Sequence, residues 1–135
     1  MDVDGMKSLW DQEFDGLIYQ SEESAEPFTS WQAIADYWDA APTVVEAVDE
    51  WRSLDRWTTM VGDVATIFTR LTIAIRLVNV PKPLTGEIRC SLVMRQTPSG
   101  KWLEVKSIPV ATGGGLPNFY TVESIADPEP ERPSA

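Results

Sequence analysis

The sequence predicts an α+β fold with a strongly curved antiparallel sheet of about four to five strands wrapped around N-terminal helices. Helical patterns lie in the first third of the chain, and three long stretches of alternating apolar residues follow them. Helices followed by a run of strands are typical of an α+β domain. A chain of 135 residues fits one domain of ordinary size. We place this domain at residues 1–112 and a flexible segment, acidic and proline-rich at its end, at residues 113–135.

The helical part begins with three apolar residues at helical spacing, Met6, Leu9 and Trp10. A short strand is predicted for residues 14–19. The next helix is opened by the pattern at residues 29–32, Thr-Ser-Trp-Gln, which matches a capping box. Its apolar positions cover so much of its girth that we expect it to be wedged between other elements. Pro42 ends it, because the residue before a proline avoids the helical region.

Four strand patterns follow. Residues 43–46 fit either a short helix or a strand, and a strand is predicted from about residue 50 to 61. A Gly62-Asp63 turn then leads into a strand at residues 64–78, whose odd-numbered positions are nearly all apolar. Strands at residues 87–96 and 102–110 are joined by a Pro-Ser-Gly-Lys turn. One face of the first of these two strands is apolar.

Composition excludes several classes of function. The net charge is −10, and residues 1–50 hold 13 of the 21 acidic residues but only one basic residue. Such a surface repels phosphate backbones, so we expect no nucleic-acid partner. It is either a solubilising surface, which we favour, or a set of acidic helices that neutralise a basic sheet. We expect no membrane association, no metal and no cofactor, because no membrane span, signal peptide or metal-ligand cluster is visible. The single cysteine, Cys90, and the missing signal favour a cytoplasmic location.

Three sequence motifs, in their order along the chain, resemble those of a known family. The helix ends in Ile34-Ala35-Asp36-Tyr37-Trp38, a Gly-Asp-Val-Ala turn follows at residues 62–65, and an arginine-rich strand at residues 89–95 leads to the Gly-Lys-Trp hairpin at residues 100–102. Over roughly residues 2–110 the chain resembles the SnoaL-like branch of the nuclear transport factor 2-like superfamily, which includes ketosteroid isomerase-like proteins. The resemblance implies a cone-shaped α+β barrel with an internal cavity.

The resemblance also implies features that this chain lacks. Members usually begin with a long helix across the mouth of the cone, followed by an Asp-containing turn. Residues 2–6 look like that turn, so we expect the chain to start where the first helix would have ended, either because it is truncated or because the protein does without that helix. We expect residues 116–120, or a partner subunit, to cover the exposed apolar face. Enzymes of the superfamily often use a histidine or paired carboxylates, but this chain has no histidine. Lys106 stands near the position where relatives often carry one.

The candidate ligand-binding residues are Tyr19, Tyr37, Trp38, Trp57 and Arg89. Trp38 and Trp57 would form a pocket wall where the helix end and a strand converge, although core packing is the ordinary role of the six tryptophans. Arg89 would hold a ligand carboxylate or enolate if its strand face were concave. On a solvated face, ion pairs explain it. Arg70 and Arg76 are open to the same two interpretations.

Catalytic use of the polar residues needs a buried carboxylate with a raised pKa. Asp15, Tyr19 and Asp36 could form an acid–base group with Tyr37, but Asp36 falls on the polar stripe of its helix. Cys90 lies among apolar residues, so we expect an inert buried thiol. The catalytic residues, if there are any, are unknown.

Three functions are compatible with these patterns. We favour a domain that binds a small apolar or aromatic ligand in the cone. The alternatives are an enzyme of the isomerase, cyclase or hydrolase type that uses carboxylate, tyrosine and arginine groups, and a non-catalytic dimerisation module. In each case we expect a homodimer formed through the sheet.

Overall fold

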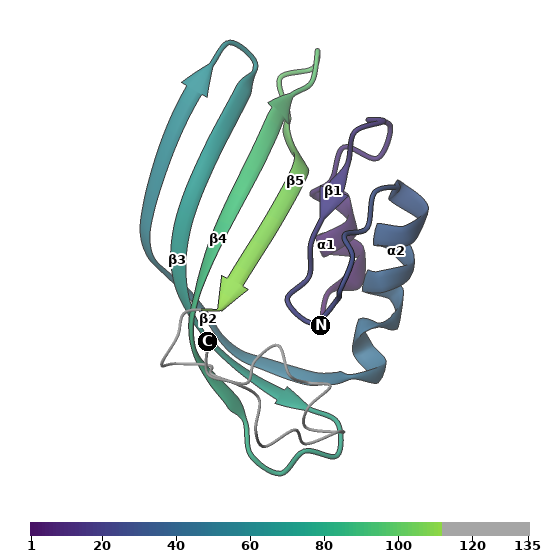
Figure 1. Cartoon of the computed structure of the whole chain (residues 1–135), viewed down its shortest axis with the longest axis vertical. Coiled ribbons are helices and arrows are strands. Elements are labelled where there is room, and N and C mark those ends of the chain that lie inside the picture. The colour runs from purple at the N-terminus through teal and green to yellow at the C-terminus, as the bar shows by residue number, and fades with distance from the viewer. Residues whose placement is uncertain (112–135) are drawn as a thin grey trace.

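A five-stranded curved sheet with two helices beside its concave face forms the body of the protein (Figure 1). We describe it from a computed structural model, which describes residues 1–111. The elements are α1 (Val3–Ser8), β1 (Ile18–Tyr19), α2 (Trp31–Ala40), the 3-10 helix η1 (Ala41–Thr43), β2 (Val45–Val61), β3 (Val64–Leu77), β4 (Leu84–Gln96) and β5 (Trp102–Ala111). The segment from residue 113 onward, including residues 116–120, lies outside the described residues.

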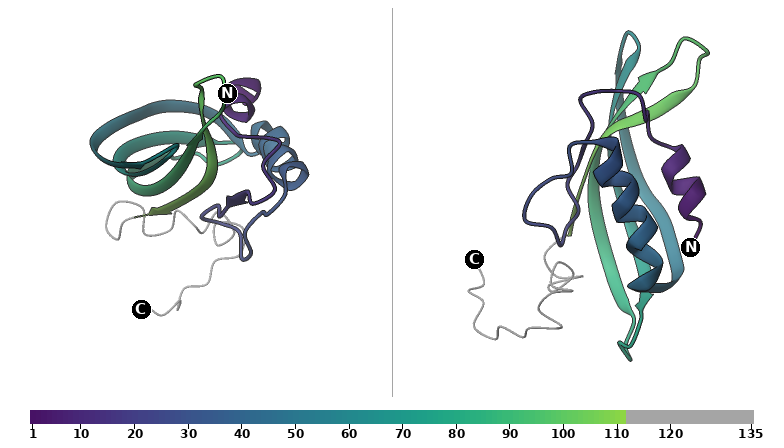
Figure 2. Two further views of the ribbon diagram at one scale, coloured as in Figure 1. Left: turned by 90° about the horizontal axis from the view of Figure 1, so that it is seen from above. Right: turned by 90° about the vertical axis from the view of Figure 1, so that its right-hand side faces the viewer.

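The sheet order is β1-β5-β4-β3-β2. Strands β2 to β5 form an antiparallel meander, and β1 pairs in parallel with β5, so that Ile18 lies opposite Lys106. Seen from above, the sheet curls round one side of the interior while α1 and α2 lie on the other (Figure 2). The predicted α+β plan with a curved sheet of four to five strands is therefore confirmed.

The curvature of the sheet has a local cause in β2. Its pairing with β3 is interrupted at three places, between Val45 and Ala47, Val48 and Glu50, and Ser53 and Asp55. An extra residue in one strand bends it and increases its twist. The strand begins at Val45, so the open choice at residues 43–46 resolves into the turn η1 followed by a strand. The hairpin to β3 turns at Gly62, whose φ of 60° suits glycine.

The two faces of the sheet have different chemistry. The odd-numbered residues of β3 face inward, and Leu71, Ile73 and Leu77 are buried there, as the alternation predicts. On the outer face, Arg70 pairs with Asp55 at 2.7 Å and with Glu87 at 3.0 Å. Arg76 pairs with Asp49 at 2.8 Å and with Glu46 at 3.1 Å. The sheet arginines are thus neutralised mainly by acids on neighbouring strands and not by the helices.

Helix α2 supplies the side of the core opposite the sheet. Ile34 and Ala35 are buried, whereas Gln32, Asp36 and Asp39 face solvent as predicted. The predicted capping box is wrong in register. Ser30 is the N-cap and its hydroxyl accepts from Ala33 N at 3.2 Å, while the Gln32 amide donates to Asp36 at 2.8 Å. With Ser30 as the cap, the third helical position is an alanine, which has no side chain to reach back.

The N-terminal residues form a helix and not the predicted Asp-containing turn. Asp2 caps α1 by accepting from Gly5 N at 2.8 Å, and Lys7 joins α1 to Asp39 of α2 at 2.8 Å. The strand predicted for residues 14–19 is reduced to Ile18 and Tyr19. The main core cluster gathers these segments around five buried residues, Trp10, Leu17, Tyr19, Ile34 and Val105. None of the helices in residues 1–111 is long and apolar enough to cross a membrane.

Replacing Ile34 with alanine should destabilise the fold, because Ile34 is fully buried at 0 % exposure. Truncation of a buried Ile to Ala costs about 2–5 kcal/mol of unfolding free energy. Urea denaturation followed by tryptophan fluorescence measures the loss. Val61→Ala is the control, since Val61 is 74 % exposed and should lose about 0.5 kcal/mol or less. Equal losses in the two variants would contradict this assignment of the core.

Candidate functional site

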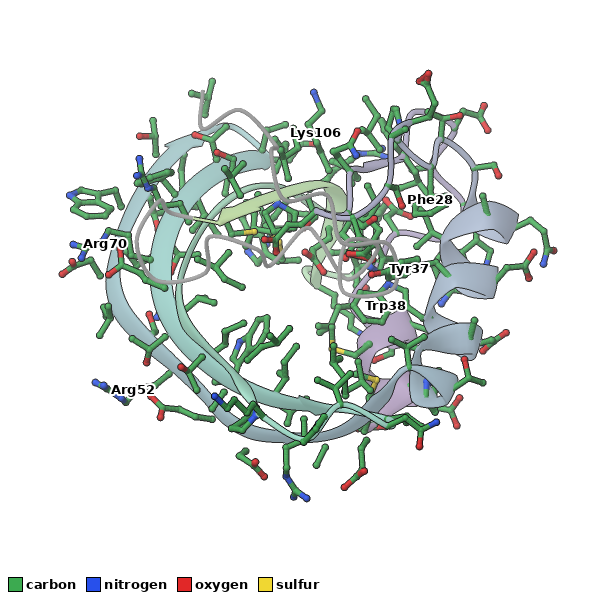
Figure 3. All side chains as sticks on the ribbon, turned by 60° about the horizontal axis from the view of Figure 1, so that its bottom comes forward. Phe28, Tyr37, Trp38, Arg52, Arg70 and Lys106 are labelled. Carbon is green, nitrogen blue, oxygen red and sulfur yellow. The ribbon has the colours of Figure 1, made fainter. Side chains whose placement is uncertain are left out.

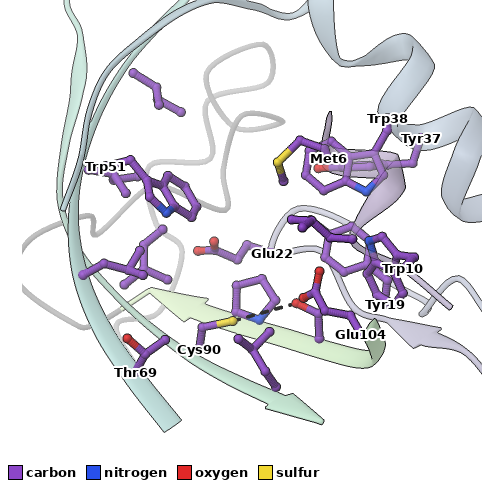
Figure 4. Close-up of a pocket in the computed structure, with 18 of the residues that line it drawn as sticks. Met6, Trp10, Tyr19, Glu22, Tyr37, Trp38, Trp51, Thr69, Cys90 and Glu104 are labelled. Carbon is purple, nitrogen blue, oxygen red and sulfur yellow. Dashed lines mark hydrogen bonds between the residues drawn. The ribbon is translucent and has the colours of Figure 1, made fainter. Parts of the chain in front are cut away.

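A cavity of about 330 Å³ lies between the concave face of the sheet and the N-terminal segments (Figure 4). Its wall is mostly apolar and aromatic. The helices and the loops beside them contribute Met6, Leu9, Trp10, Tyr37 and Trp38. The sheet contributes Tyr19 of β1, and Trp51, Leu71, Ile73, Ile75, Ile88 and Leu92. Trp51 is 62 % exposed, so it stands at the open side of the cavity. The volume falls in the ordinary range for small-molecule sites.

Three of the predicted binding residues line this cavity. Tyr19, Tyr37 and Trp38 pack as one aromatic group, with Tyr19 stacked on Trp38 at 5.6 Å between ring centroids. Tyr37 meets Tyr19 and Trp38 edge-on, each at 5.2 Å. Figure 3 shows Tyr37 and Trp38 extending from α2 toward the interior. Their role in binding a ligand stays a prediction.

The other two predicted residues do not line the cavity. Trp57 lies opposite Phe68 on the outer face, is 53 % exposed and packs on Phe68 at 5.6 Å. The irregular pairing of β2 changes which of its side chains point inward, so Trp51 reaches the cavity. Arg89 is exposed and lies opposite Arg70, whose side chain points outward (Figure 3). Placing Trp57 and Arg89 in the pocket was therefore wrong. The outer face is convex, and solvent-facing ion pairs explain the arginines there.

The remaining basic residues of the sheet also stay outside. Lys106 points away from the interior (Figure 3), so it does not occupy a cavity position. Arg95 lies over the ring of Phe14 at 5.1 Å and reaches Asp11 at 3.5 Å. The proposed acid–base group of Asp15 and Asp36 with the two tyrosines does not assemble, because both aspartates are exposed and Asp36 is bound to Gln32.

Three glutamates that sequence reasoning missed line the cavity, and two of them, Glu22 and Glu104, have strongly raised pKa values. Burial and repulsion by Glu23 raise the pKa of Glu22 to about 8, and burial raises the pKa of Glu104 to about 7. Glu22 belongs to an acidic loop at residues 20–27 that looks like a solvated segment in the sequence. Figure 4 shows both carboxyl groups pointing into the cavity.

A bulge in β5 explains why Glu104 was missed. Strict alternation from the inward Ser107 would place Glu104 on the outer face. The pairing of β4 with β5 shifts at this point. Val93 pairs with Lys106, but the next residue, Met94, pairs with Glu104, so Val105 is the extra residue of the bulge. The backbone N–H of Glu104 donates to Leu9 O at 2.7 Å, which ties this bulge to the end of α1. A bulge has no signature in this sequence.

The polar contacts in the cavity join the loop, the helix and the sheet. The Tyr37 hydroxyl donates to Glu23 Oε2 at 2.6 Å, and burial and the Glu23 charge raise the Tyr37 pKa. Burial also raises the pKa of Tyr19. The Tyr37–Glu23 pair borders a second hollow of about 250 Å³, which lies between the end of α2 and β2 and β3. All of these hydroxyls stay protonated at neutral pH.

Cys90 has surroundings that fit the prediction of an inert thiol. It faces the cavity, lies 3.8 Å from the Ser107 hydroxyl, and burial raises its pKa to about 11. A thiol with a raised pKa is a weak nucleophile at neutral pH. Within residues 1–111, no group of three or more His, Cys, Asp or Glu side chains is placed to hold a metal ion.

Comparisons with known proteins bear on the fold. No family model matches the chain, and no curated protein matches it. Solved structures do match. A protein provisionally described as a dehydratase of the nuclear transport factor 2-like family from Streptomyces avermitilis has a TM-score of 0.67 at 13 % identity, covering 82 % of this chain and 83 % of the other. The chain has the nuclear transport factor 2-like fold.

Other structures with this fold show the same level of likeness. A nuclear transport factor 2-like protein from Cytophaga hutchinsonii has a TM-score of 0.63 at 16 % identity, with 82 % of this chain and 83 % of the other covered. A protein provisionally described as a ketosteroid isomerase from Parabacteroides distasonis has a TM-score of 0.62 at 13 % identity, with 84 % and 77 % covered. At these identities the nuclear transport factor 2-like likeness concerns the fold alone.

The raised pKa of Glu22 makes stability depend on pH. A carboxyl with a pKa near 8 in the folded chain binds more protons there than in the unfolded chain, so its contribution to stability is lost as pH rises toward 8. The unfolding free energy should fall between pH 6 and 8.5, and Glu22→Gln should flatten this slope. The raised pKa of Glu104 also lowers the unfolding free energy as the pH rises. The chain has no histidine whose titration would add to this pH dependence.

Urea denaturation at closely spaced pH values measures this slope. Asp36→Asn is the matched control, because Asp36 is an exposed acid on α2. It should keep the parent slope. A Glu22→Gln protein with an unchanged slope would show that Glu22 is ionised in the fold at neutral pH.

Proposed function

We propose that this protein binds a small apolar or aromatic molecule in the cavity between the concave sheet face and α2. The observation that carries the proposal is an unfilled space of about 330 Å³ in the middle of an apolar wall. A ligand that buries about 200 Å² of apolar surface there would gain about 5 kcal/mol at about 25 cal/mol per Å².

The cost of the cavity supports the proposal. Protein interiors are close-packed, so an apolar space of this size beside the core leaves its lining side chains without packing partners. Larger side chains at Thr69 or Ser107 would fill part of it, since both face the cavity from the sheet. The rings of Tyr19 and Trp38 hold one another in place and form a rigid, preformed wall. Preformed walls reduce the ordering cost of binding.

A cavity-filling variant tests this proposal. Ser107→Phe should weaken the binding of a neutral aromatic probe, 2-naphthylmethanol, by about tenfold or more, because the new ring occupies the ligand's space. Isothermal titration calorimetry measures the affinity, and circular dichroism checks that the variant is folded. Ser91→Phe is the matched control, since Ser91 is exposed on the outer face of the same sheet. Equal affinities in the two variants would place the binding site elsewhere.

Acid–base catalysis on the bound molecule is the second candidate function. The specific observation is the pKa of about 7 at Glu104, because a general acid or base works best with a pKa near the working pH. The arginines expected for such an enzyme face outward, so the catalytic groups would be the glutamates and tyrosines. Glu104→Gln should then lower turnover of a bound substrate by about 100-fold or more and leave its binding intact. A catalytic role would be contradicted by unchanged turnover.

The predicted homodimer through the sheet stays a prediction. Its support is the exposed pair of Trp57 and Phe68 on the outer face, where an apolar surface interrupts the ion pairs.

A further inference from the structure

The charges that face the cavity all have one sign. Three carboxyl groups line it, those of Glu22, Glu23 and Glu104, and no lysine or arginine does so among the described residues. The arginines of β3 point to the opposite face of the sheet and are paired there with acids. The cavity is therefore an acidic space inside an apolar wall.

Aromatic rings lie on both sides of the Glu22 carboxyl group, which forms no salt bridge within the described residues. In Figure 4 the Glu22 carboxyl lies between Trp51 on the sheet side and the Trp10, Tyr19 and Trp38 group on the other side. The face of an aromatic ring carries negative charge density and attracts a cation within about 6 Å of its centre. The rings and the carboxyl groups of this cavity therefore both favour a positively charged ligand.

Two buried polar atoms of the cavity lack a hydrogen-bond partner within residues 1–111. They are Glu22 Oε2 and Trp38 Nε1, and neither is exposed to solvent. Buried polar atoms in folded proteins nearly always have a partner. Both side chains line the cavity, so the polar groups of a ligand bound there are the nearest candidates to satisfy these two atoms.

We propose that the molecule bound in this cavity is a monocationic amine with an apolar or aromatic body, its ammonium group held between Glu22 and Glu104 and its body against the aromatic wall. This inference rests on the proposed function, since it names the ligand class of the same cavity. An anionic ligand is disfavoured, because three carboxyl groups would repel it and no cation on the wall would hold it.

Binding of an ammonium group is linked to proton release. The ionisable groups that face the two glutamates are Glu23, Tyr19, Tyr37 and Cys90, and none of them can carry a positive charge. Burial keeps Glu22 and Glu104 partly protonated near neutral pH. A cation favours their ionised forms, so they release protons on binding. The affinity for an amine should therefore rise between pH 6 and 8.

Three probes with one aromatic body test the ligand class: 2-naphthylmethylammonium, 2-naphthylmethanol and 2-naphthoate. Titration calorimetry of the full chain at pH 8 and 0.15 M salt should give an affinity about tenfold higher for the ammonium than for the alcohol, the size of one charge-assisted hydrogen bond. The carboxylate should bind most weakly. Titration in buffers of different ionisation enthalpy should show protons released with the ammonium only.

Paired variants assign the preference to the cavity glutamates. Glu22→Gln and Glu104→Gln should each remove most of the tenfold preference for the ammonium over the alcohol. Glu26→Gln is the matched control, because Glu26 is exposed in the same acidic loop and this variant removes a negative charge outside the cavity. It should keep the full preference.

The outcomes separate the two proposals. If the alcohol binds as tightly as the ammonium, the amine inference is wrong and binding in the cavity stands. If the ammonium preference survives in both cavity variants, it comes from the overall charge of −10 and the inference is wrong again. If none of the three probes binds at millimolar concentration, the proposed function fails together with the inference.

Discussion

The structure depends on the bend of the sheet between β2 and β4. The irregular pairing of β2 turns the long meander into a trough, and α2 lies across from it without filling it. The main core cluster forms around Ile34 and Tyr19, beside the trough, while Leu71, Ile73 and Ile88 form a second cluster on the sheet itself. The space between these two clusters is the cavity. A flatter sheet would bring them together and close it.

The same bend sorts the charged groups of the sheet. On the convex face, water and neighbouring acids solvate Arg70 and Arg76 at little cost, and such exposed pairs contribute little to stability. On the concave face, Glu104 is largely buried and no lysine or arginine of the described residues lines the cavity beside it, so it holds a proton more tightly than an exposed carboxyl. The arginines of the outer face are thus paired with acids, whereas the carboxyl groups of the cavity have no lysine or arginine beside them among the described residues.

Sequence reasoning predicted most of the fold and part of the site. The alternation in β3 and the apolar stripe of α2 gave the correct faces, because both elements are regular, and Tyr37 and Trp38 therefore lie where expected. Trp57 was misplaced and Glu104 was missed because bulges in β2 and β5 change which side chains of these strands point inward. Glu22 was overlooked because the composition of an acidic loop predicts a solvent-exposed segment. Only the tertiary packing shows that the Glu22 side chain lines the cavity.

A crystal structure of the protein under xenon pressure would test the central claim most directly, since xenon enters apolar cavities. The account predicts a xenon atom between Ile73 and Trp38, inside a trough of unchanged curvature. Side chains such as Trp51 or Met6 packed into that space, with no room for xenon, would contradict it.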